Sequence, residues 1–384
     1  MPIPLAIPEV GSAEERNLRE CIATNFVSSV GPFVSRFEAE VAALSGCREG
    51  VATCSGTAGL HLALRCVGVK SGDLVVVPTF TFIASANAVA HCGAIPWLFD
   101  CNDESWTLCP VQLGAALAER TQPTAAGLVH RTSGRRVAAI LPVHALGQPA
   151  DLEPLLEVAQ RHQVPLVADA AAALGATYHG QPIGRGPTLS VFSFNGNKTI
   201  TTGGGGMVVG DDLAVLGPVR HLCTTARTGR EYDHDRVGYN YRMTNLQAAV
   251  GCAQLERLEH FLERKRAIRE RYKEAFSDLP GVASFPTPAW SRSAHWLSGI
   301  VLPQGRAALL PSLIAGLEAR GIEARSFWKP VHLQRPYRNC PKENLGRSEA
   351  LWARILTLPS STSLSGKDQG TVIDAVRELC LAML

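Results

Sequence analysis

The stretch VFSFNGNKTITTGGGG, residues 191–206, places a lysine in a loop of small residues directly after a β-rich run. The run Val191–Phe194 predicts a buried strand, and Met207–Val209 predicts a second strand beyond the four glycines. Glycine adopts backbone conformations that other residues rarely reach, so this loop can bring Lys198 close to a bound molecule. A lysine placed in this way can form an imine with a carbonyl compound.

Strand-like and helix-like segments alternate on the N-terminal side of this loop. The other expected strands are Leu74–Val77, Ile95–Phe99, Val137–Leu141 and Val164–Ala168, and the expected helices include Ala58–Val67 and Asp151–His162. Strand and helix in alternation predict an α/β fold with a mostly parallel sheet and helices on both faces. We assign residues 1–255, with an N-terminal helix, to a large domain built on this sheet.

The C-terminal third follows a different pattern. Helical periodicity runs from Thr244 to Phe276, which predicts one long helix that bridges to a second, smaller domain. That domain is expected to be α+β, with strands near Leu297–Leu302 and Ile322–Phe327, a helix near Leu310–Arg320, and two later helices. The second unit therefore covers residues 256–384.

Two further motifs end strands or begin helices in the large domain. Asp169 directly follows a buried apolar run, where a carboxylate is costly without a cationic partner such as a protonated pyridine nitrogen. Gly56 and Thr57 lead directly into the expected helix Ala58–Val67, and free backbone N–H groups at a helix start can hold a phosphate. Taken singly, Asp169 is also typical of a helix N-cap or a structural ion pair, and Ser55-Gly56-Thr57 of a plain N-cap. The order phosphate loop, aspartate, lysine makes the ligand-binding interpretation the better one.

Composition and charge exclude several other classes of function. The net charge of +3 gives no electrostatic footprint for nucleic acid or an anionic membrane. No apolar run is long enough to span a bilayer, and Met1–Val10 does not have the pattern of a secretory signal, so we expect a cytoplasmic protein. None of the eleven cysteines falls in a Cys-x-x-Cys pair, so we expect free thiols and no metal site.

Six motifs occur in the order typical of one enzyme family. They are Ser55-Gly56-Thr57-Ala58, Val77-Pro78-Thr79-Phe80-Thr81-Phe82, Pro142-Val143-His144, Asp169-Ala170-Ala171, the lysine loop from Ser193 to Lys198, and Gly238-Tyr239-Asn240-Tyr241-Arg242. Together they resemble the DegT/StrS-type sugar-nucleotide aminotransferases, and most closely the LegC-like and perosamine-synthase-like subgroup. The resemblance covers essentially the whole chain. It implies the aspartate-aminotransferase-like fold type I, with a seven-stranded sheet, and pyridoxal 5′-phosphate as cofactor.

The resemblance also assigns roles to single residues. Lys198 corresponds to the lysine that holds the cofactor as a Schiff base, and Asp169 to the partner of the pyridine nitrogen. Phe82 matches the aromatic residue that stacks on the cofactor ring. Phosphate-binding positions correspond to Gly56, Thr57, Ala58 and Ser193, and also to Asn240, which in the family reaches the cofactor of the neighbouring subunit. His332, Phe26 and Ser29 lie where the family approaches the sugar nucleotide. A homodimer with shared active sites is therefore implied.

The implied reaction is a ping-pong transamination in polysaccharide biosynthesis. Glutamate is the expected amino donor, and the acceptor is a nucleotide-linked 4-keto-6-deoxy sugar, of a 2-acetamido type and linked to UDP or GDP. Two alternatives remain open: an aminotransferase for a 3-keto sugar nucleotide or another ketone, and a non-catalytic regulatory protein that binds the cofactor. The retained Lys198 argues against the dehydratase branch of the family, where histidine replaces it. Ala172 departs from the family pattern, because members usually carry Gln, Glu or His there, near the phenolic oxygen of the cofactor.

Overall fold

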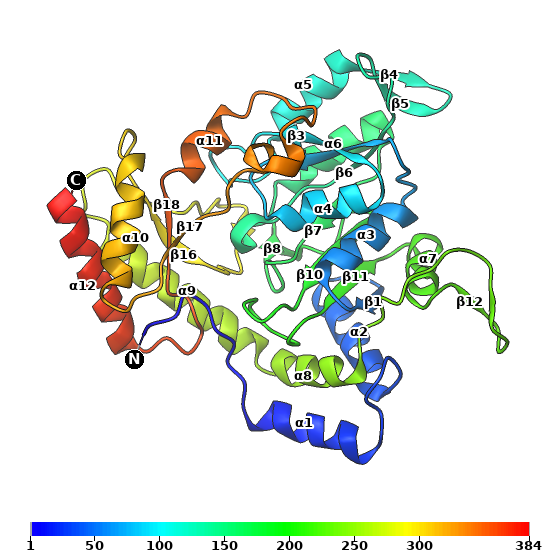
Figure 1. The fold of residues 1–384 in the computed structure, drawn as a ribbon, viewed down its shortest axis with the longest axis horizontal. Helices are drawn as coiled ribbons and strands as arrows, with labels where there is room; N and C mark the ends of the chain where they lie inside the picture. Colours follow the sequence, from blue (N-terminus) through cyan, green and yellow to red (C-terminus); the bar gives the residue numbers. More distant parts are fainter. Residues whose placement is uncertain (1, 384) are drawn as a thin grey trace.

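A computed structural model describes residues 2–383, and a twisted sheet forms the centre of its larger part (Figure 1). In spatial order the strands are β3 (Ile95–Phe99), β2 (Leu74–Pro78), β6 (Val137–Ile140), β7 (Val167–Asp169), β10 (Leu189–Ser193), β11 (Gly206–Gly210) and β1 (Glu49–Thr53). Single parallel bridges, Ile140 to Leu166 and Val143 to Asp169, join β6 to β7. Neighbours are parallel except at β11, which is antiparallel to both β10 and β1. The expected seven-stranded, mostly parallel sheet is confirmed.

Helices cover both faces of this sheet (Figure 1). One face packs against α3 (Gly56–Cys66), α4 (Ile83–His91) and α7 (Leu213–Cys223). The other face packs against α2 (Pro32–Leu44), α5 (Pro110–Arg120), α6 (Leu152–His162) and α8 (Asn245–Leu255). Buried helices on both sides explain why the strands read as nearly continuous apolar runs.

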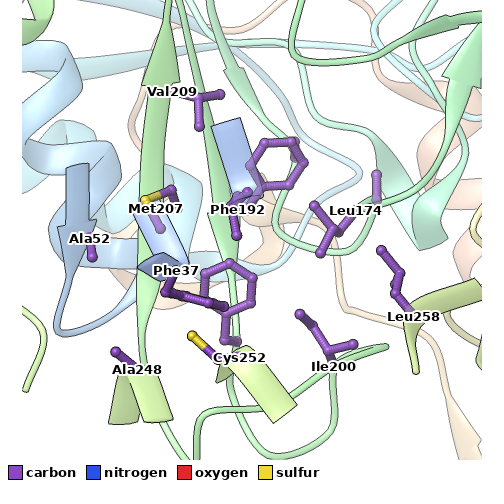
Figure 2. Packing of buried hydrophobic residues seen from close by; sticks show 14 of the residues in the cluster. Phe37, Ala52, Leu174, Phe192, Ile200, Met207, Val209, Ala248, Cys252 and Leu258 are labelled. Carbon is purple, nitrogen blue, oxygen red and sulfur yellow. The ribbon is translucent and has the colours of Figure 1, made fainter. Parts of the chain in front are cut away.

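Successive side chains of β11 enter different cores, as the pleat of a strand requires. Met207 and Val209 lie in the cluster under α2 and α8, where Phe37 of α2 also lies (Figure 2). Val208, between them, belongs to the cluster on the opposite face. Phe37 also packs edge-to-face against Phe194, with 4.9 Å between ring centroids. This contact fixes the start of the lysine loop against the core.

The long helix expected over Thr244–Phe276 is instead two helices. Helix α8 ends at Leu255, and α9 (Leu258–Ala275) begins after a turn at Glu256 and Arg257. The first half of α9 packs into the core of the large sheet, whereas its second half packs into the core of the C-terminal part. The apolar residues on either side of the turn keep a three-residue spacing, Leu255 to Leu258, so periodicity alone could not reveal the break.

The C-terminal part has its own core and an antiparallel sheet, as an α+β unit should. The sheet order is β14 (Ala283–Ser284), β16 (Ser298–Val301), β18 (Ile355–Leu358) and β17 (Arg325–Ser326), and the helices are α10 (Leu310–Glu318), α11 (Gly346–Trp352) and α12 (Gly366–Met383). Strand β18 was not expected from the sequence, and the strand expected at Ile322–Phe327 is only two residues long.

The first residues of the chain lie against this C-terminal part, which the sequence did not indicate (Figure 1). Ile3 pairs with Ile322, and the Ile3 N–H donates to the carbonyl of Gly321 at 2.8 Å. The other elements are α1 (Ser12–Ala23), β4 (Thr121–Thr124), β5 (Gly127–His130), β8 (Thr177–Tyr178), β9 (Gln181–Pro182), β12 (Arg227–Thr228), β13 (Asp233–His234) and β15 (Ser291–Arg292). No helix within residues 2–383 is long and apolar enough to cross a membrane.

Candidate active site

A cavity of about 310 Å³ opens at the carboxyl ends of β2, β6, β7 and β10. Ligands of open α/β sheets bind at this edge. The cavity brings together most of the residues that the sequence singled out, namely Gly56, Thr57, Phe82, Asp169, Ser193 and Lys198. Residues far apart in the chain therefore meet because the strands that precede them end at one edge.

Lys198 lies in a loop that folds back on the end of β10. The Thr202 N–H donates to the carbonyl of Phe194 at 2.9 Å, and the Phe194 N–H donates to that of Gly205. Gly205 has a φ of +150°, and a Cβ at this position would lie 2.4 Å from the Thr202 hydroxyl, so only glycine fits. The loop presents the Lys198 amine to the cavity, and burial lowers the pKa of Lys198 to about 8, although the charge of Asp169 opposes that shift.

Asp169 is the last residue of β7 and is only 5% exposed. Its carboxylate accepts a hydrogen bond from the Ser85 hydroxyl at 2.6 Å and one from the Ala171 N–H at 3.0 Å. Burial raises the pKa of Asp169, whereas these two hydrogen bonds and the nearby Lys198 favour the charged form. The result is a fixed acceptor at the floor of the cavity, suited to a cationic or protonated ring nitrogen.

The first turn of α3 provides a cradle for an anion. The N–H groups of Gly56 and Thr57 stand at the first two helical positions, where no carbonyl of the helix can accept from them. A Cβ on Gly56 would lie 2.9 Å from the Cβ of Ser193, so glycine keeps this cradle open. The expectation for Ala58 needs correction, because its N–H donates to the Ser55 hydroxyl at 3.1 Å and is not free for a phosphate.

Three aromatic side chains form one wall of the cavity. Phe82, at the start of α4, is 51% exposed, and its ring centroid lies 5.6 Å from that of Trp328. Trp296 lies 5.5 Å from Trp328, and the Lys198 amine is 4.1 Å from the Trp296 ring centroid. The indole N–H of Trp296 donates to the Asn197 carbonyl at 2.6 Å. Both tryptophans come from the C-terminal part, and sequence reasoning missed them because no local motif marks them.

The side chain of Lys265, in α9, anchors the backbone of Trp296. Its buried amine donates to the carbonyls of Trp296, at 2.9 Å, and of Ser360, at 2.6 Å. Burial lowers the pKa of Lys265 to about 7. The sequence offered no signal for this role, because a lysine in a helix rich in charges reads as part of a solvated face.

Four further predicted site residues lie outside this cavity, as Ala58 does. Asn240 is exposed, and Phe26 and Ser29 lie on the segment between α1 and α2. His332 is buried, with its Nδ1 2.7 Å from the Thr79 hydroxyl and its Nε2 2.8 Å from Glu349. Both ring nitrogens of His332 are therefore engaged, and in this structure it supports the segment after β2 rather than lining the cavity.

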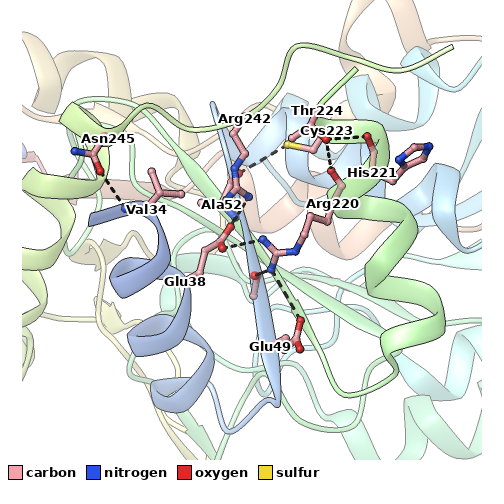
Figure 3. A network of polar contacts seen from close by, with 11 residues as sticks. Val34, Glu38, Glu49, Ala52, Arg220, His221, Cys223, Thr224, Arg242 and Asn245 are labelled. Atoms are coloured by element: carbon pink, nitrogen blue, oxygen red, sulfur yellow. Dashed lines mark hydrogen bonds and ion pairs between the residues drawn. The ribbon is translucent and has the colours of Figure 1, made fainter. Parts of the chain in front are cut away.

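The segment that carries Asn240 is anchored by a buried carboxylate. Glu38 accepts from Arg242 at 2.5 Å, from Arg220 at 2.9 Å and from the Ala52 N–H at 2.7 Å (Figure 3). The Cys54 N–H also donates to the carbonyl of Tyr241 at 2.7 Å. These contacts fix the backbone next to Asn240 while its side chain stays at the surface.

Comparison with known proteins agrees with this arrangement. The model of the DegT/DnrJ/EryC1/StrS aminotransferase family matches residues 8–377.

The chain belongs to this family.

The GDP-perosamine synthase of Caulobacter vibrioides is 37% identical over 379 residues, with 98% of both chains covered. That of Vibrio cholerae is 34% identical over 380 residues, covering 98% of this chain and 97% of the relative. The crystal structure of the aminotransferase TlmJ from Streptoalloteichus hindustanus has a TM-score of 0.90 at 29% identity, with both chains fully covered. The protein is therefore an aminotransferase that uses pyridoxal phosphate.

The residues at the cavity fit this cofactor. An open anion cradle at α3, a buried carboxylate at β7 and an amine in the lysine loop match the phosphate, ring nitrogen and aldehyde of one molecule. Residues 2–383 contain no cluster of three or more histidine, cysteine or acidic side chains that could hold a metal ion.

The lowered pKa of Lys198 predicts how the apoprotein takes up pyridoxal phosphate as pH changes. Only the neutral amine attacks an aldehyde, so the rate of uptake should rise with pH and reach half its maximum near pH 8, rather than at the ordinary 10.5. Asp169→Asn should move this midpoint lower, because the charge of Asp169 raises the pKa of Lys198. Stopped-flow absorbance over a pH series measures both midpoints. A wild-type midpoint as high as that of the side-chain amine of free Nα-acetyl-lysine would contradict the claim that burial lowers the pKa of Lys198.

Proposed function

We propose that the protein transfers the amino group of glutamate to the C4 ketone of a GDP-linked 4-keto-6-deoxy sugar. The observation that carries this proposal is the similarity to two GDP-perosamine synthases over 98% of this chain. The sequence alone left UDP and GDP open, and these relatives favour GDP. They give no support for the 2-acetamido group expected from the sequence, and the proposal leaves the 2-substituent unassigned.

The residues at the cavity divide the work of this reaction. Pyridoxal phosphate supplies, when bound, a carbon that bonds to the transferred nitrogen and a ring that accepts electrons. Asp169 holds a negative charge at the ring nitrogen, and Ser85 keeps its carboxylate in place. The Lys198 amine carries a proton between the nitrogen-bearing carbon of the amino compound and the aldehyde carbon of the cofactor. A pKa of about 8 suits a group that must both accept and release this proton. The Gly56 and Thr57 amides and the Ser193 hydroxyl hold the phosphate.

The aromatic wall gives the cavity its second function. Phe82 and Trp328 flank the opening, and their rings offer apolar surface to the cofactor and to the less polar face of a 6-deoxy sugar. The Trp296 ring lies over the Lys198 amine, where its face attracts a positive charge. The wall belongs partly to the C-terminal part of the chain, so the two parts must stay packed together for the site to exist.

We also propose that two copies of the chain share their sites. The segments that carry Asn240 and Phe26 adjoin, since the Asn245 N–H donates to the Ser28 carbonyl at 2.6 Å and the Asn245 side chain to that of Phe26 at 2.9 Å. Both segments lie on the outside of the chain that carries them. Exposed apolar side chains lie near them in the sequence, with Val27 and Val30 beside Phe26 and Val237 three residues before Asn240. Such a surface favours a protein partner, and a second copy would bring Asn240 to a cavity it cannot reach in its own chain.

A substrate panel tests the proposed acceptor. The holoprotein is incubated with glutamate and with 4-keto-6-deoxy sugars linked to GDP, UDP or dTDP, together with 3-keto counterparts. The GDP-linked 4-keto sugar should give the highest kcat/KM, and mass spectrometry should show the mass of the amino sugar. Lys198→Ala serves as the control for non-enzymatic amination. A UDP-linked or 3-keto sugar as the preferred acceptor would replace the proposed substrate.

A further inference from the structure

His144 has one ring nitrogen bonded and the other buried without a partner. The Ala150 N–H donates to Nδ1 at 2.8 Å, so Nδ1 is an acceptor and the proton of the neutral ring sits on Nε2. The residue is 1% exposed, and burial lowers its pKa to about 4, which keeps the ring neutral. Within residues 2–383, Nε2 has no hydrogen-bond partner. A buried donor without an acceptor is costly, which indicates that a ligand supplies one.

The place of His144 in the sheet shows which ligand atom this is. His144 lines the cavity just after β6, and its backbone N–H donates to the backbone carbonyl of Asp169 at 2.9 Å. Strand β7, which ends in Asp169, lies between β6 and β10, and β10 ends in Ser193. His144 and Ser193 therefore stand on opposite sides of Asp169.

The cofactor has its substituents on opposite sides in the same way. Its phosphate arm and its phenolic oxygen lie on either side of the line from the ring nitrogen to the aldehyde carbon. If the nitrogen is at Asp169 and the phosphate at Gly56 and Ser193, the phenolic oxygen faces the side of β6. This step rests on the cofactor placement proposed above.

The side chain of Ala172 also lines the cavity, and its methyl group cannot donate a hydrogen bond. The carbonyl of Ala172 would lie 2.9 Å from a Cβ on Gly147, which places residue 172 beside the turn that follows His144. Alanine at 172 and a free donor on His144 thus occur on the same side of the site.

We propose that the Nε2–H of His144 donates a hydrogen bond to the phenolic oxygen of pyridoxal phosphate, in place of a side chain at position 172. His144 is then a cofactor-binding residue that sets the proton affinity of the bound cofactor. A donor at the phenolic oxygen favours the form in which that oxygen carries negative charge. It therefore lowers the pKa of the protonated nitrogen that joins the cofactor to Lys198.

Two substitutions separate the functions of the two ring nitrogens. His144→Asn keeps an acceptor near Nδ1 for the Ala150 N–H and removes the donor at Nε2. His144→Gln keeps a donor near Nε2 and removes the acceptor. The visible absorbance of the holoprotein, titrated with pH and without any sugar, reports the loss of the proton. Asp169 and Lys198 are the other titratable side chains that line this cavity among the described residues, and neither is altered.

His144→Asn should raise the midpoint of this titration by about one pH unit, the usual effect of one neutral hydrogen bond. His144→Gln should stay close to the wild type, and Ala172→Gln added to His144→Asn should bring the midpoint back down. An unchanged midpoint in folded His144→Asn, or equal shifts in both single variants, would overturn the proposal. Circular dichroism and thermal unfolding check the fold of each variant.

A crystal structure of the unmodified holoprotein tests the same contact if the variants do not fold. Nε2 within hydrogen-bonding distance of the phenolic oxygen supports the proposal, and Nε2 bonded to another group overturns it. If the pyridine nitrogen of the cofactor lies away from Asp169, the cofactor placement itself is refuted. Because neither experiment uses the sugar, neither result depends on the proposed acceptor.

Discussion

Asp169→Asn should lower transamination by several orders of magnitude while the protein stays folded. Asparagine can accept from the Ala171 N–H with its oxygen and donate to the Ser85 hydroxyl oxygen with its NH2 group, so β7 and the cavity should keep their geometry. It carries no negative charge, however, and cannot keep a ring nitrogen protonated. Because the carboxylate is buried, water does not screen this loss, and a reduction of about 10³-fold or more in kcat is expected.

Turnover, cofactor content and thermal unfolding of the variant are the measurements. Ser85→Ala is the matched control, because it removes one hydrogen bond to the same carboxylate and leaves the charge. Its loss of activity should be much smaller. Turnover of Asp169→Asn close to the wild type would refute the role proposed for Asp169.

Mixing two inactive variants should restore activity if the sites are shared. Lys198→Ala removes the amine, and Asn240→Asp should weaken cofactor binding because it sets a negative charge against the phosphate. In a heterodimer with shared sites, one site collects both defects and the other has neither. With random pairing, half of the dimers are mixed and each has one intact site, so about a quarter of wild-type activity should return.

The alternative predicts no recovery. If Asn240 served the cavity of its own chain, or only capped a turn, each site of the heterodimer would carry one defect. Two affinity tags on the two variants isolate the heterodimer and show that it has formed. An isolated heterodimer without activity would make Asn240 a structural residue and would remove the support for shared sites.

Sequence reasoning found most of the sheet, and the edge of the sheet that carries the site residues, because both depend on local sequence patterns. Apolar runs of three to five residues marked six of the seven strands, and the residues just after them, Asp169 and Lys198, had to meet at the carboxyl edge. The break between α8 and α9 could not be found in this way. It arises because α9 changes from one core to the other, and the choice of partner core is not written in the spacing of apolar residues.

The aromatic wall and the side chains that hydrogen-bond within the site could not be predicted from local sequence patterns, for a related reason. Trp296 and Trp328 belong to a part of the chain that reaches the cavity only through tertiary packing. Ser85 lies 84 residues from Asp169, and nothing in its own helix marks it as a donor to a carboxylate. His144 stood in a recognised motif, but its role depends on which ring nitrogen is occupied, and only the structure shows that.

Reduction of the holoprotein with borohydride, followed by peptide mapping, tests the central claim most directly. If Lys198 binds the cofactor covalently, reduction fixes a pyridoxyl group to it, and mass spectrometry should find this label on the peptide that contains Lys198. Buried Lys265 is the internal comparison, since its amine already donates to two carbonyls and should stay unlabelled. A pyridoxyl label on Lys265 or on any lysine other than Lys198 would contradict the account.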